Sequence, residues 1–242
     1  MADEVIKVCV DRPSPTRDSS GRPLTVETAK MWQPGTTLRI RFLDGDPSIQ
    51  EKVFQHAQEW CQYANIKFEV STDPDAEIRI TFKESGSWSL IGTDALQEDM
   101  NKPTMNYGWF DQTTPDDEYR RTVVHEFGHA LGCEHEQASP AADIHWNKQA
   151  TYRYYQSTQG WSKEDVDQQV FEKYSTPTTQ FTTWDKNSIM QYPIPAGLTT
   201  DGVQVGWNKD LTDTDKEFIK SKYPGVEDPN TGTEIGNRIS PI

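Results

Sequence analysis

The stretch from His125 to Glu136, which reads HEFGHALGCEHE, decides the fold of this chain. It holds three of the five histidines. His125 and His129 are four residues apart, so on a helix they share one face and can bind a single Zn²⁺ at about 2.0–2.1 Å each. His135 is six residues further on, and at about 100° per residue an unbroken helix would point it away from that face. Gly132 has no Cβ and can adopt a positive φ, so we expect the helix to end there and the chain to turn His135 back toward the metal.

Glu126 directly follows the first histidine of this stretch. Three neutral imidazole nitrogens leave the fourth position of a tetrahedral zinc open for water, which is typical of a catalytic rather than a structural site. Zinc lowers the pKa of such a water to about 7. A carboxylate beside it can take the proton and later donate it to a leaving amine. The sequence therefore predicts a hydrolytic zinc site with Glu126 as the general base.

The spacing of the three histidines is the signature of the metzincin clan of zinc endopeptidases. Within that clan the sequence resembles the astacin-like branch, over roughly residues 32–223. Two further features carry the resemblance. Glu136 directly follows the third histidine, and Ser188–Tyr192 (SIMQY) resembles the Met-turn of the clan followed by the tyrosine of astacins. The sequence departs from the pattern at Gln191, where many astacins have histidine, and it lacks the two-disulfide framework of animal astacins.

The resemblance implies roles for individual residues. Met190 would lie beneath the three imidazoles as an apolar floor without binding the metal. Tyr192 would bind the metal, or swing away from it and donate a hydrogen bond to the oxyanion. In astacins the glutamate after the third histidine meets the N-terminus that propeptide cleavage frees. If Glu136 meets a freed N-terminus in the same way, cleavage near residues 20–35 should raise activity.

Cys9 is a candidate for a further metal ligand. A thiolate binds zinc well, and the related matrixins silence themselves with a cysteine from an N-terminal segment. One hypothesis is that Cys9, or Asp11 near it, occupies the open zinc position in a latent form. The alternative, which we favour from the sequence alone, is that Cys9 belongs to an N-terminal strand and has no such role. Three cysteines cannot all pair within one chain, and we expect Cys61 and Cys133 to be small buried residues.

The composition describes an acidic, polar chain of 242 residues, with a net charge of −14 and a mean hydropathy of −0.82. This charge disfavours nucleic acid and anionic membranes as partners and mildly favours basic or neutral substrates. No apolar run is long enough to span a bilayer. The first residues show no apolar segment typical of a signal peptide, whereas the resemblance favours secretion, so the compartment stays open. Proteins or peptides are the expected partners, and the sequence does not indicate an oligomeric state.

The periodicity of the chain changes several times and predicts its elements. Strands are expected at 37–43, 66–70, 77–82, 88–93 and 104–110. Helices are expected at 48–64 with Ser48 as N-cap, at 115–131 with Thr114 as N-cap, and at 148–157, 162–174 and 211–223. The pattern indicates an α/β (α+β) chain whose regular strands all lie before the histidine stretch.

We predict a metzincin-like fold with a zinc cleft between two lobes. Residues 1–30 would be an N-terminal extension that could act as a pro-segment, and residues 225–242 a tail. Between them, residues 31–224 would form the zinc metalloprotease domain, with lobes at 31–132 and 133–224. The N-terminal lobe would hold a twisted, mixed five-stranded sheet and two long helices, and the C-terminal lobe would be mostly irregular with a few helices.

The segment Trp88–Thr93 resembles the antiparallel edge strand that lies above the cleft in this clan. An extended peptide can pair with the unpaired N–H and C=O groups of such a strand, although an ordinary blunted edge fits the sequence equally well. The sequence as a whole predicts a zinc-dependent endopeptidase that hydrolyses peptide bonds in proteins. One alternative is a non-catalytic zinc-binding interaction module, against which the presence of Glu126 argues. Another is a metalloamidase for small molecules, which would not need peptide pairing along the edge strand.

Overall fold

The computed structural model describes residues 7–10, 12, 30–173 and 183–225. Most of the expected extension 1–30, including Asp11, and all but the first residue of the expected tail 225–242 lie outside these residues. Five strands form one sheet, in the spatial order β2-β1-β3-β5-β4. They are β1 (Thr37–Phe42), β2 (Lys67–Val70), β3 (Ile78–Thr81), β4 (Ser87–Ser89) and β5 (Met105–Tyr107).

The sheet is mixed, as expected, but its strands are shorter than the sequence pattern suggested. The expected strand at 88–93 is wrong beyond Ser89, because Gly92–Gln97 form a 3₁₀ helix. Strands β2, β1, β3 and β5 run parallel, and β4 pairs antiparallel with β5 at one edge. In β1 the side chains of Leu38 and Ile40 are fully buried, which fits the period-two alternation of that strand. Because β4 has a strand of the sheet on one side only, its other edge can pair with another chain segment, and Cys9 and Val10 pair with Ser87 there.

The first helix, α1 (Pro47–Ala57), is shorter than the expected 48–64. Its N-cap is Asp46, whose side chain accepts the N–H of Ser48, so the expected capping by Ser48 is wrong. After the helix the chain continues in a 3₁₀ turn at Trp60–Gln62. The apolar pattern runs on past the helix because Trp60 and Ala64 enter the same core from this turn. The apolar periodicity therefore predicted the buried positions correctly but placed the end of the helix too far along the chain.

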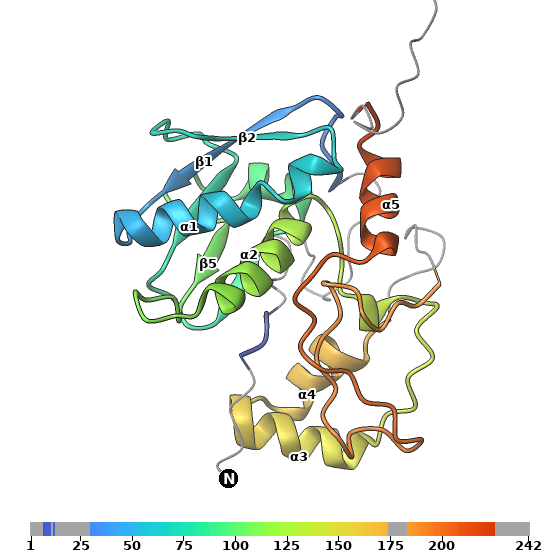
Figure 1. The fold of residues 1–242 in the computed structure, drawn as a ribbon. Helices are drawn as coiled ribbons and strands as arrows, with labels where there is room; N and C mark the ends of the chain where they lie inside the picture. The colour runs from blue at the N-terminus through green and yellow to red at the C-terminus, as the bar shows by residue number, and fades with distance from the viewer. Residues whose placement is uncertain (1–6, 11, 13–29, 174–182, 226–242) are drawn as a thin grey trace, which may run out of the picture.

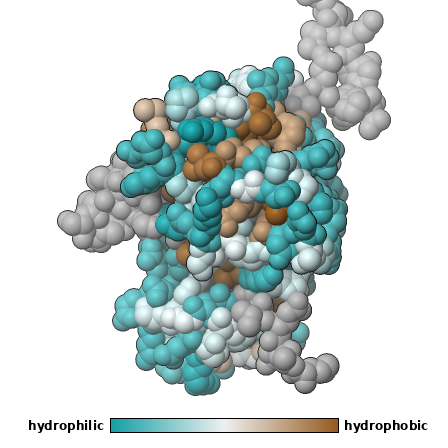
Figure 2. All heavy atoms as spheres, turned by 90° about the vertical axis from the view of Figure 1, so that its left-hand side faces the viewer, coloured by the Kyte–Doolittle hydropathy of each residue, from teal (hydrophilic) through white to brown (hydrophobic). Residues whose placement is uncertain are grey.

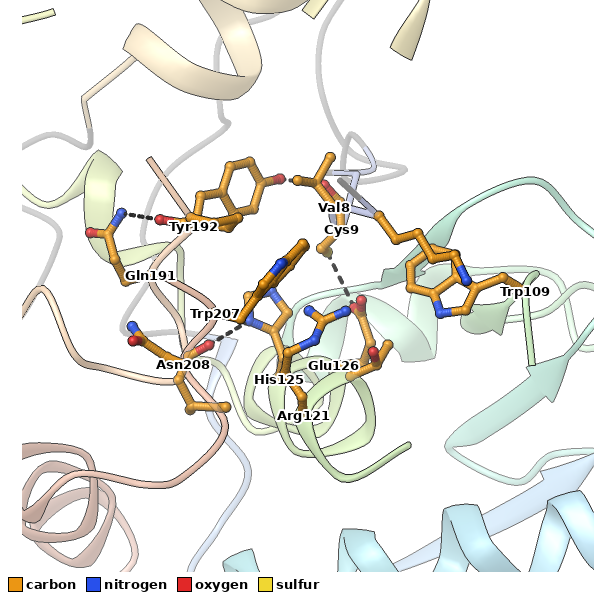
Figure 3. Close-up of a pocket in the computed structure, with 14 residues that line it drawn as sticks. Val8, Cys9, Trp109, Arg121, His125, Glu126, Gln191, Tyr192, Trp207 and Asn208 are labelled. Atoms are coloured by element: carbon orange, nitrogen blue, oxygen red, sulfur yellow. Dashed lines mark hydrogen bonds between the residues drawn. The ribbon is translucent and has the colours of Figure 1, made fainter. Parts of the chain in front are cut away.

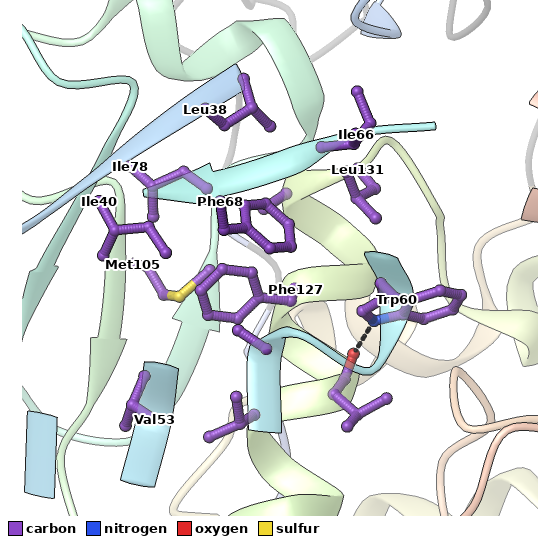
Figure 4. Packing of buried hydrophobic residues seen from close by; sticks show 14 of the residues in the cluster. Leu38, Ile40, Val53, Trp60, Ile66, Phe68, Ile78, Met105, Phe127 and Leu131 are labelled. Carbon is purple, nitrogen blue, oxygen red and sulfur yellow. Dashed lines mark hydrogen bonds between the residues drawn. The ribbon is translucent and has the colours of Figure 1, made fainter. Parts of the chain in front are cut away.

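The helix that carries the first two histidines is α2 (Asp116–Ala130). Pro115, and not the expected Thr114, occupies the N-cap position, where no side chain makes a capping hydrogen bond. Acidic residues fill the first turn and interact favourably with the helix dipole. Phe127 fixes α2 to the sheet, since its ring lies 4.9 Å from that of Phe68 in an edge-to-face contact. Trp60 holds the other side through a hydrogen bond of 2.7 Å from its Nε1 to the carbonyl of Val124 (Figure 4).

The rest of the chain carries short helices and loops, as expected for this half of the sequence. Figure 1 shows α3 (Lys148–Gln159) and α4 (Lys163–Val166) together, away from the sheet. The expected helix 162–174 is only partly formed, because α4 passes into a π turn that ends at Phe171. The last helix, α5 (Asp213–Lys222), packs its fully buried Ile219 into the main core beside the sheet. A second apolar cluster lies around α3 and α4; its buried members are Ala142, Ile144, Tyr155, Val166, Val170, Ile194, Leu198 and Val205.

The surface agrees with the acidic, polar composition. Figure 2 shows a mostly hydrophilic face on which apolar side chains form separate patches. Among the described residues, no helix combines the length and the apolar character that crossing a membrane requires.

Candidate active site

The structure brings the three histidines of the signature stretch together at the C-terminal half of α2. Nε2 of His135 lies 3.2 Å from Nε2 of His125 and 3.1 Å from Nε2 of His129. Nδ1 of His125 lies 2.7 Å from the carbonyl of Ile189, and Nδ1 of His129 lies 2.8 Å from the carbonyl of Cys133. A ring nitrogen beside a carbonyl oxygen must carry the proton, so the Nε2 lone pairs of these two rings point inward.

This arrangement fits a tetrahedral zinc ion. Three nitrogens at about 2.0–2.1 Å from one Zn²⁺ would be roughly 3.3 Å apart, close to the separations found here. Burial, and then repulsion from His129 and His135, lower the pKa of His125 well below its usual range. That imidazole is therefore neutral at ordinary pH, which is the form that binds a metal.

Gly132 makes the turn that places the third histidine. Its φ is +92°, as expected for the residue that ends the helix. The N–H of Cys133 then donates to the carbonyl of Gly128 at 2.9 Å, and the chain doubles back toward the metal position. A side chain at Gly132 would be strained in this conformation, so the approach of His135 depends on glycine here.

Glu126 faces the same centre and is fully buried. One of its carboxylate oxygens accepts a hydrogen bond of 2.5 Å from the hydroxyl of Ser87, on the edge strand β4. The other accepts a hydrogen bond of 3.3 Å from the thiol of Cys9 (Figure 3). Ser87 was not identified from the sequence, because nothing in its neighbourhood signals a partner that lies 39 residues away.

Cys9 lies inside the histidine cluster. Its sulfur and the ligand nitrogens of His125, His129 and His135 all lie within 4.8 Å of one another, and all four residues are buried. Its backbone pairs with Ser87 in a parallel bridge, and the N–H of Val10 donates to the carbonyl of Ser87 at 2.9 Å. In Figure 1 the N-terminal segment, which here means residues 7–10 and 12, runs between α2 and the region of α3. The two alternatives considered for Cys9, pairing as part of an N-terminal strand and placement at the metal position, are therefore not exclusive, since Cys9 does both.

Residues 188–192 lie under the cluster. The Met190 side chain is buried, and the space above Gly128, between the two helical histidines, is filled by its sulfur. This segment is anchored by Asp215 at the start of α5, whose carboxylate accepts the hydroxyl of Ser188 at 2.6 Å and the N–H of Ile189 at 3.1 Å. The carbonyl of Ile189 in turn accepts a hydrogen bond from Nδ1 of His125. Through Asp215 and Ile189, α5 therefore helps to fix the orientation of a metal-ligating histidine.

A pocket opens beside the cluster. Figure 3 shows Trp109, Trp207 and Arg121 around it, with Cys9 and Glu126 at its inner end. Arg121 stacks on Trp207 at 4.0 Å and pairs with Glu118 at 2.7 Å, so its charge is partly neutralised. The pocket therefore leads from solvent to the base and the metal position.

Comparisons with known proteins agree with this geometry. The family model of the astacin peptidases matches residues 25–204, well over half of the chain. The chain belongs to the astacin family. As a member it is a metalloendopeptidase, and its metal is zinc.

Solved structures place this astacin-family chain among known folds. "Structure of myroilysin" is 46% identical, with a TM-score of 0.80, and the match covers 83% of this chain and 98% of that one. A second "Crystal structure of myroilysin" is 45% identical with a TM-score of 0.64, covering 84% and 89%. High choriolytic enzyme 1, a hatching enzyme zinc-protease from Oryzias latipes (Medaka fish), shares the fold at 18% identity and a TM-score of 0.57, covering 81% and 95%. No curated protein sequence matches the chain.

The phenolic and acidic residues expected from the astacin pattern both lie close to the third histidine. The Tyr192 ring lies 4.3 Å from the ring of His135, and its hydroxyl donates to the carbonyl of Cys9. The Glu136 carboxylate accepts the N–H of Asp185 at 2.9 Å. Burial raises the pKa of Glu136 to about 7. The pairing of Glu136 with a freed N-terminus stays a prediction, because the expected cleavage region lies largely outside the described residues.

Proposed function

We propose that this astacin-family peptidase hydrolyses peptide bonds in proteins with Glu126 as general base and Tyr192 as the donor to the oxyanion, and that Cys9 holds it latent. Bound zinc supplies a Lewis acid and lowers the pKa of water at the position that His125, His129 and His135 surround. The observation that carries the proposal is the convergence of three Nε2 atoms next to a buried carboxylate, at the end of an edge strand.

Glu126 moves the protons in this mechanism. Its carboxylate takes a proton from the attacking water, whose oxygen forms a bond to the scissile carbonyl carbon. The same proton then passes to the nitrogen of the scissile bond, which leaves as an amine when the C–N bond breaks. Ser87 holds one carboxylate oxygen, so the other is directed at the reacting atoms.

Tyr192 would steady the negative charge on the former carbonyl oxygen through a hydrogen bond from its phenol. Its hydroxyl has a different partner here, the carbonyl of Cys9. The β4 edge supports the choice of a polypeptide substrate, since Val10 already pairs with Ser87 as an added strand would. A small amide needs no such edge.

Latency follows from what Cys9 contacts. Its sulfur lies at the metal position, its thiol contacts Glu126, and its carbonyl takes the Tyr192 hydroxyl. Cys9 thus blocks the open position of the metal and also engages the general base Glu126 and the oxyanion donor Tyr192. Displacement of this segment frees all three groups for a substrate.

The experiment that tests the proposed activity is casein cleavage by the zinc-loaded full chain after activation. Glu126→Ala should retain zinc and lose about 10²–10⁴ in rate, the usual contribution of a general base. A zinc chelator should abolish cleavage. Full activity of Glu126→Ala would refute the mechanism, absence of cleavage by the unaltered protein would favour an interaction module, and hydrolysis of small amides alone would favour an amidase.

A further inference from the structure

The N-terminal segment carries a basic side chain, Arg12, that is held from two directions. Nη2 of Arg12 lies 2.6 Å from a carboxylate oxygen of Glu84, and its guanidinium carbon lies 4.1 Å from the centre of the Trp88 ring. A carboxylate and an aromatic face each attract a cation, and the flat guanidinium can use both at once. The two side chains together form a clamp for a positive charge.

The clamp is built by the sheet and does not depend on the segment that fills it. Fully buried Asn106 of β5 holds the loop before β4, accepting the N–H of Glu84 at 3.2 Å and donating to the carbonyls of Glu84 at 3.1 Å and Gly86 at 2.7 Å. Gly108 allows this close approach, because a Cβ there would overlap the carbonyl oxygen of Glu84. Departure of the N-terminal segment would therefore leave Glu84 and Trp88 in place.

The clamp also lies on the strand along which a substrate would run. Trp88 is the middle residue of β4, and its neighbour Ser87 contacts both Glu126 and the backbone of Val10. Arg12 is three residues from Cys9, which marks the metal position. A substrate side chain about three residues from the scissile bond would reach the same clamp.

We propose that Glu84 and Trp88 form a subsite that selects an arginine or lysine side chain of the substrate, so that this peptidase prefers basic peptides. The inference rests on the proposed function, because it requires the segment to be replaced by a substrate. The net charge of −14 favours the same class of substrate at longer range. On the other side of Cys9, Lys7 lies 5.8 Å from the Trp109 ring, in a pocket that Arg121 also lines, so this position is not a cation site of the same kind.

The test is a series of quenched fluorescent peptides cleaved by the full-length, zinc-loaded protein after activation in solution. Arginine is moved one position at a time through three residues on each side of the scissile bond, and norleucine at the same positions gives a neutral side chain of similar length. Since an exposed ion pair and a cation–π contact are each modest, we expect arginine to raise kcat/KM about three- to tenfold at one position only.

Three variants test whether Glu84 is responsible for the arginine preference. Glu84→Gln should reduce the arginine preference to about twofold or less, and Glu84→Lys should turn it toward glutamate. Glu69→Gln is the matched control, an exposed glutamate of β2 at the opposite edge of the sheet, and it should keep the preference unchanged. No arginine preference in the unaltered protein, or the same preference in Glu84→Gln and Glu69→Gln, would overturn the subsite. If the unaltered protein cleaves none of the peptides, the proposed function itself fails.

Discussion

Gly128 lies between the two helical histidines, where replacement by alanine sets two effects against each other. Alanine is worth about 1 kcal/mol more than glycine inside a helix. However, a Cβ at this position would lie 2.5 Å from the Met190 sulfur and 3.2 Å from Cζ2 of Trp60. Non-bonded heavy atoms prefer about 3.5–4.0 Å, so the methionine sulfur would have to move by about 1 Å or more.

The neighbours of Gly128 have little room to yield. Met190 and Trp60 are both almost fully buried, and Trp60 is tied to α2 by its hydrogen bond to Val124. Overpacking of such a site costs about 1–3 kcal/mol, which exceeds the gain in helix propensity over most of that range. We therefore expect Gly128→Ala to lose up to about 2 kcal/mol of stability, or several degrees of Tm in a domain of this size. Because Met190 lies under the imidazoles, we also expect zinc affinity to fall about 10- to 100-fold.

Thermal unfolding of the zinc-free protein and zinc titration against a chromogenic chelator measure the two effects of Gly128→Ala separately. Gly206→Ala is the control, because a Cβ at Gly206 meets nothing within 4 Å and no positive φ is found there. Its Tm and zinc affinity should stay close to those of the unaltered protein. A Gly128→Ala protein that melts higher and binds zinc as tightly would show that helix propensity dominates and would refute the packing argument.

Three further changes test other parts of the site. Cys9→Ala should raise casein cleavage by the unprocessed full chain, and unchanged activity with unchanged zinc coordination would dispose of the latency role. Ser87→Ala should lower kcat about tenfold with little change in KM, because Glu126 loses its 2.5 Å hydrogen bond; restoration of kcat by Ser87→Thr would separate positioning from general damage. Glu136 has a raised pKa in the fold, so the native state binds its proton more tightly than the unfolded chain and stability falls as pH rises from 4.5 to about 7. In urea unfolding of the zinc-free proteins, Glu136→Gln should therefore gain stability relative to the unaltered protein across that range; a constant difference would contradict the assignment.

The sequence predicted the parts of this molecule whose signals are local. The four-residue spacing of His125 and His129, and a glycine where the helix must end, are properties of neighbouring residues, and both appear in the structure as expected. The strands β1 and β3 follow from period-two alternation at 37–43 and 77–82 for the same reason. The two N-caps were misplaced by one or two residues. Asp46 and Ser48 are both good capping residues, and the start at Pro115 has no side-chain cap that a sequence could signal.

The supporting contacts of the site could not be predicted, because they join residues far apart in the chain. Ser87 reaches Glu126 across the sheet edge, and Asp215 reaches Ser188 from the last helix. Gln137 accepts the N–H of Tyr192 at 3.1 Å across 55 positions. Ser87 and Gln137 carry no local signature at all, and Asp215 was visible only as part of a capped helix start. Their roles exist only once the topology brings β4, α5 and the loop after the third histidine around α2.

The strength of the N-terminal segment's hold explains how a few residues can keep the site closed and yet release it. Apart from the sulfur of Cys9, the segment is held by the Val10–Ser87 and Tyr192–Cys9 hydrogen bonds, by the half-exposed Arg12 on Glu84 and Trp88, and by buried Val8. At about 1 kcal/mol for each hydrogen bond and each Arg12 contact and about 2 kcal/mol for Val8, these give roughly 6 kcal/mol, or a Kd of about 40 μM for a free peptide. A segment joined to the domain by the chain has an effective concentration in the millimolar range, so without the sulfur it would still occupy the cleft most of the time. Cys9→Ala should therefore gain only a small part of full activity, whereas cleavage of the connecting chain removes this high effective concentration, and the segment then dissociates at micromolar protein.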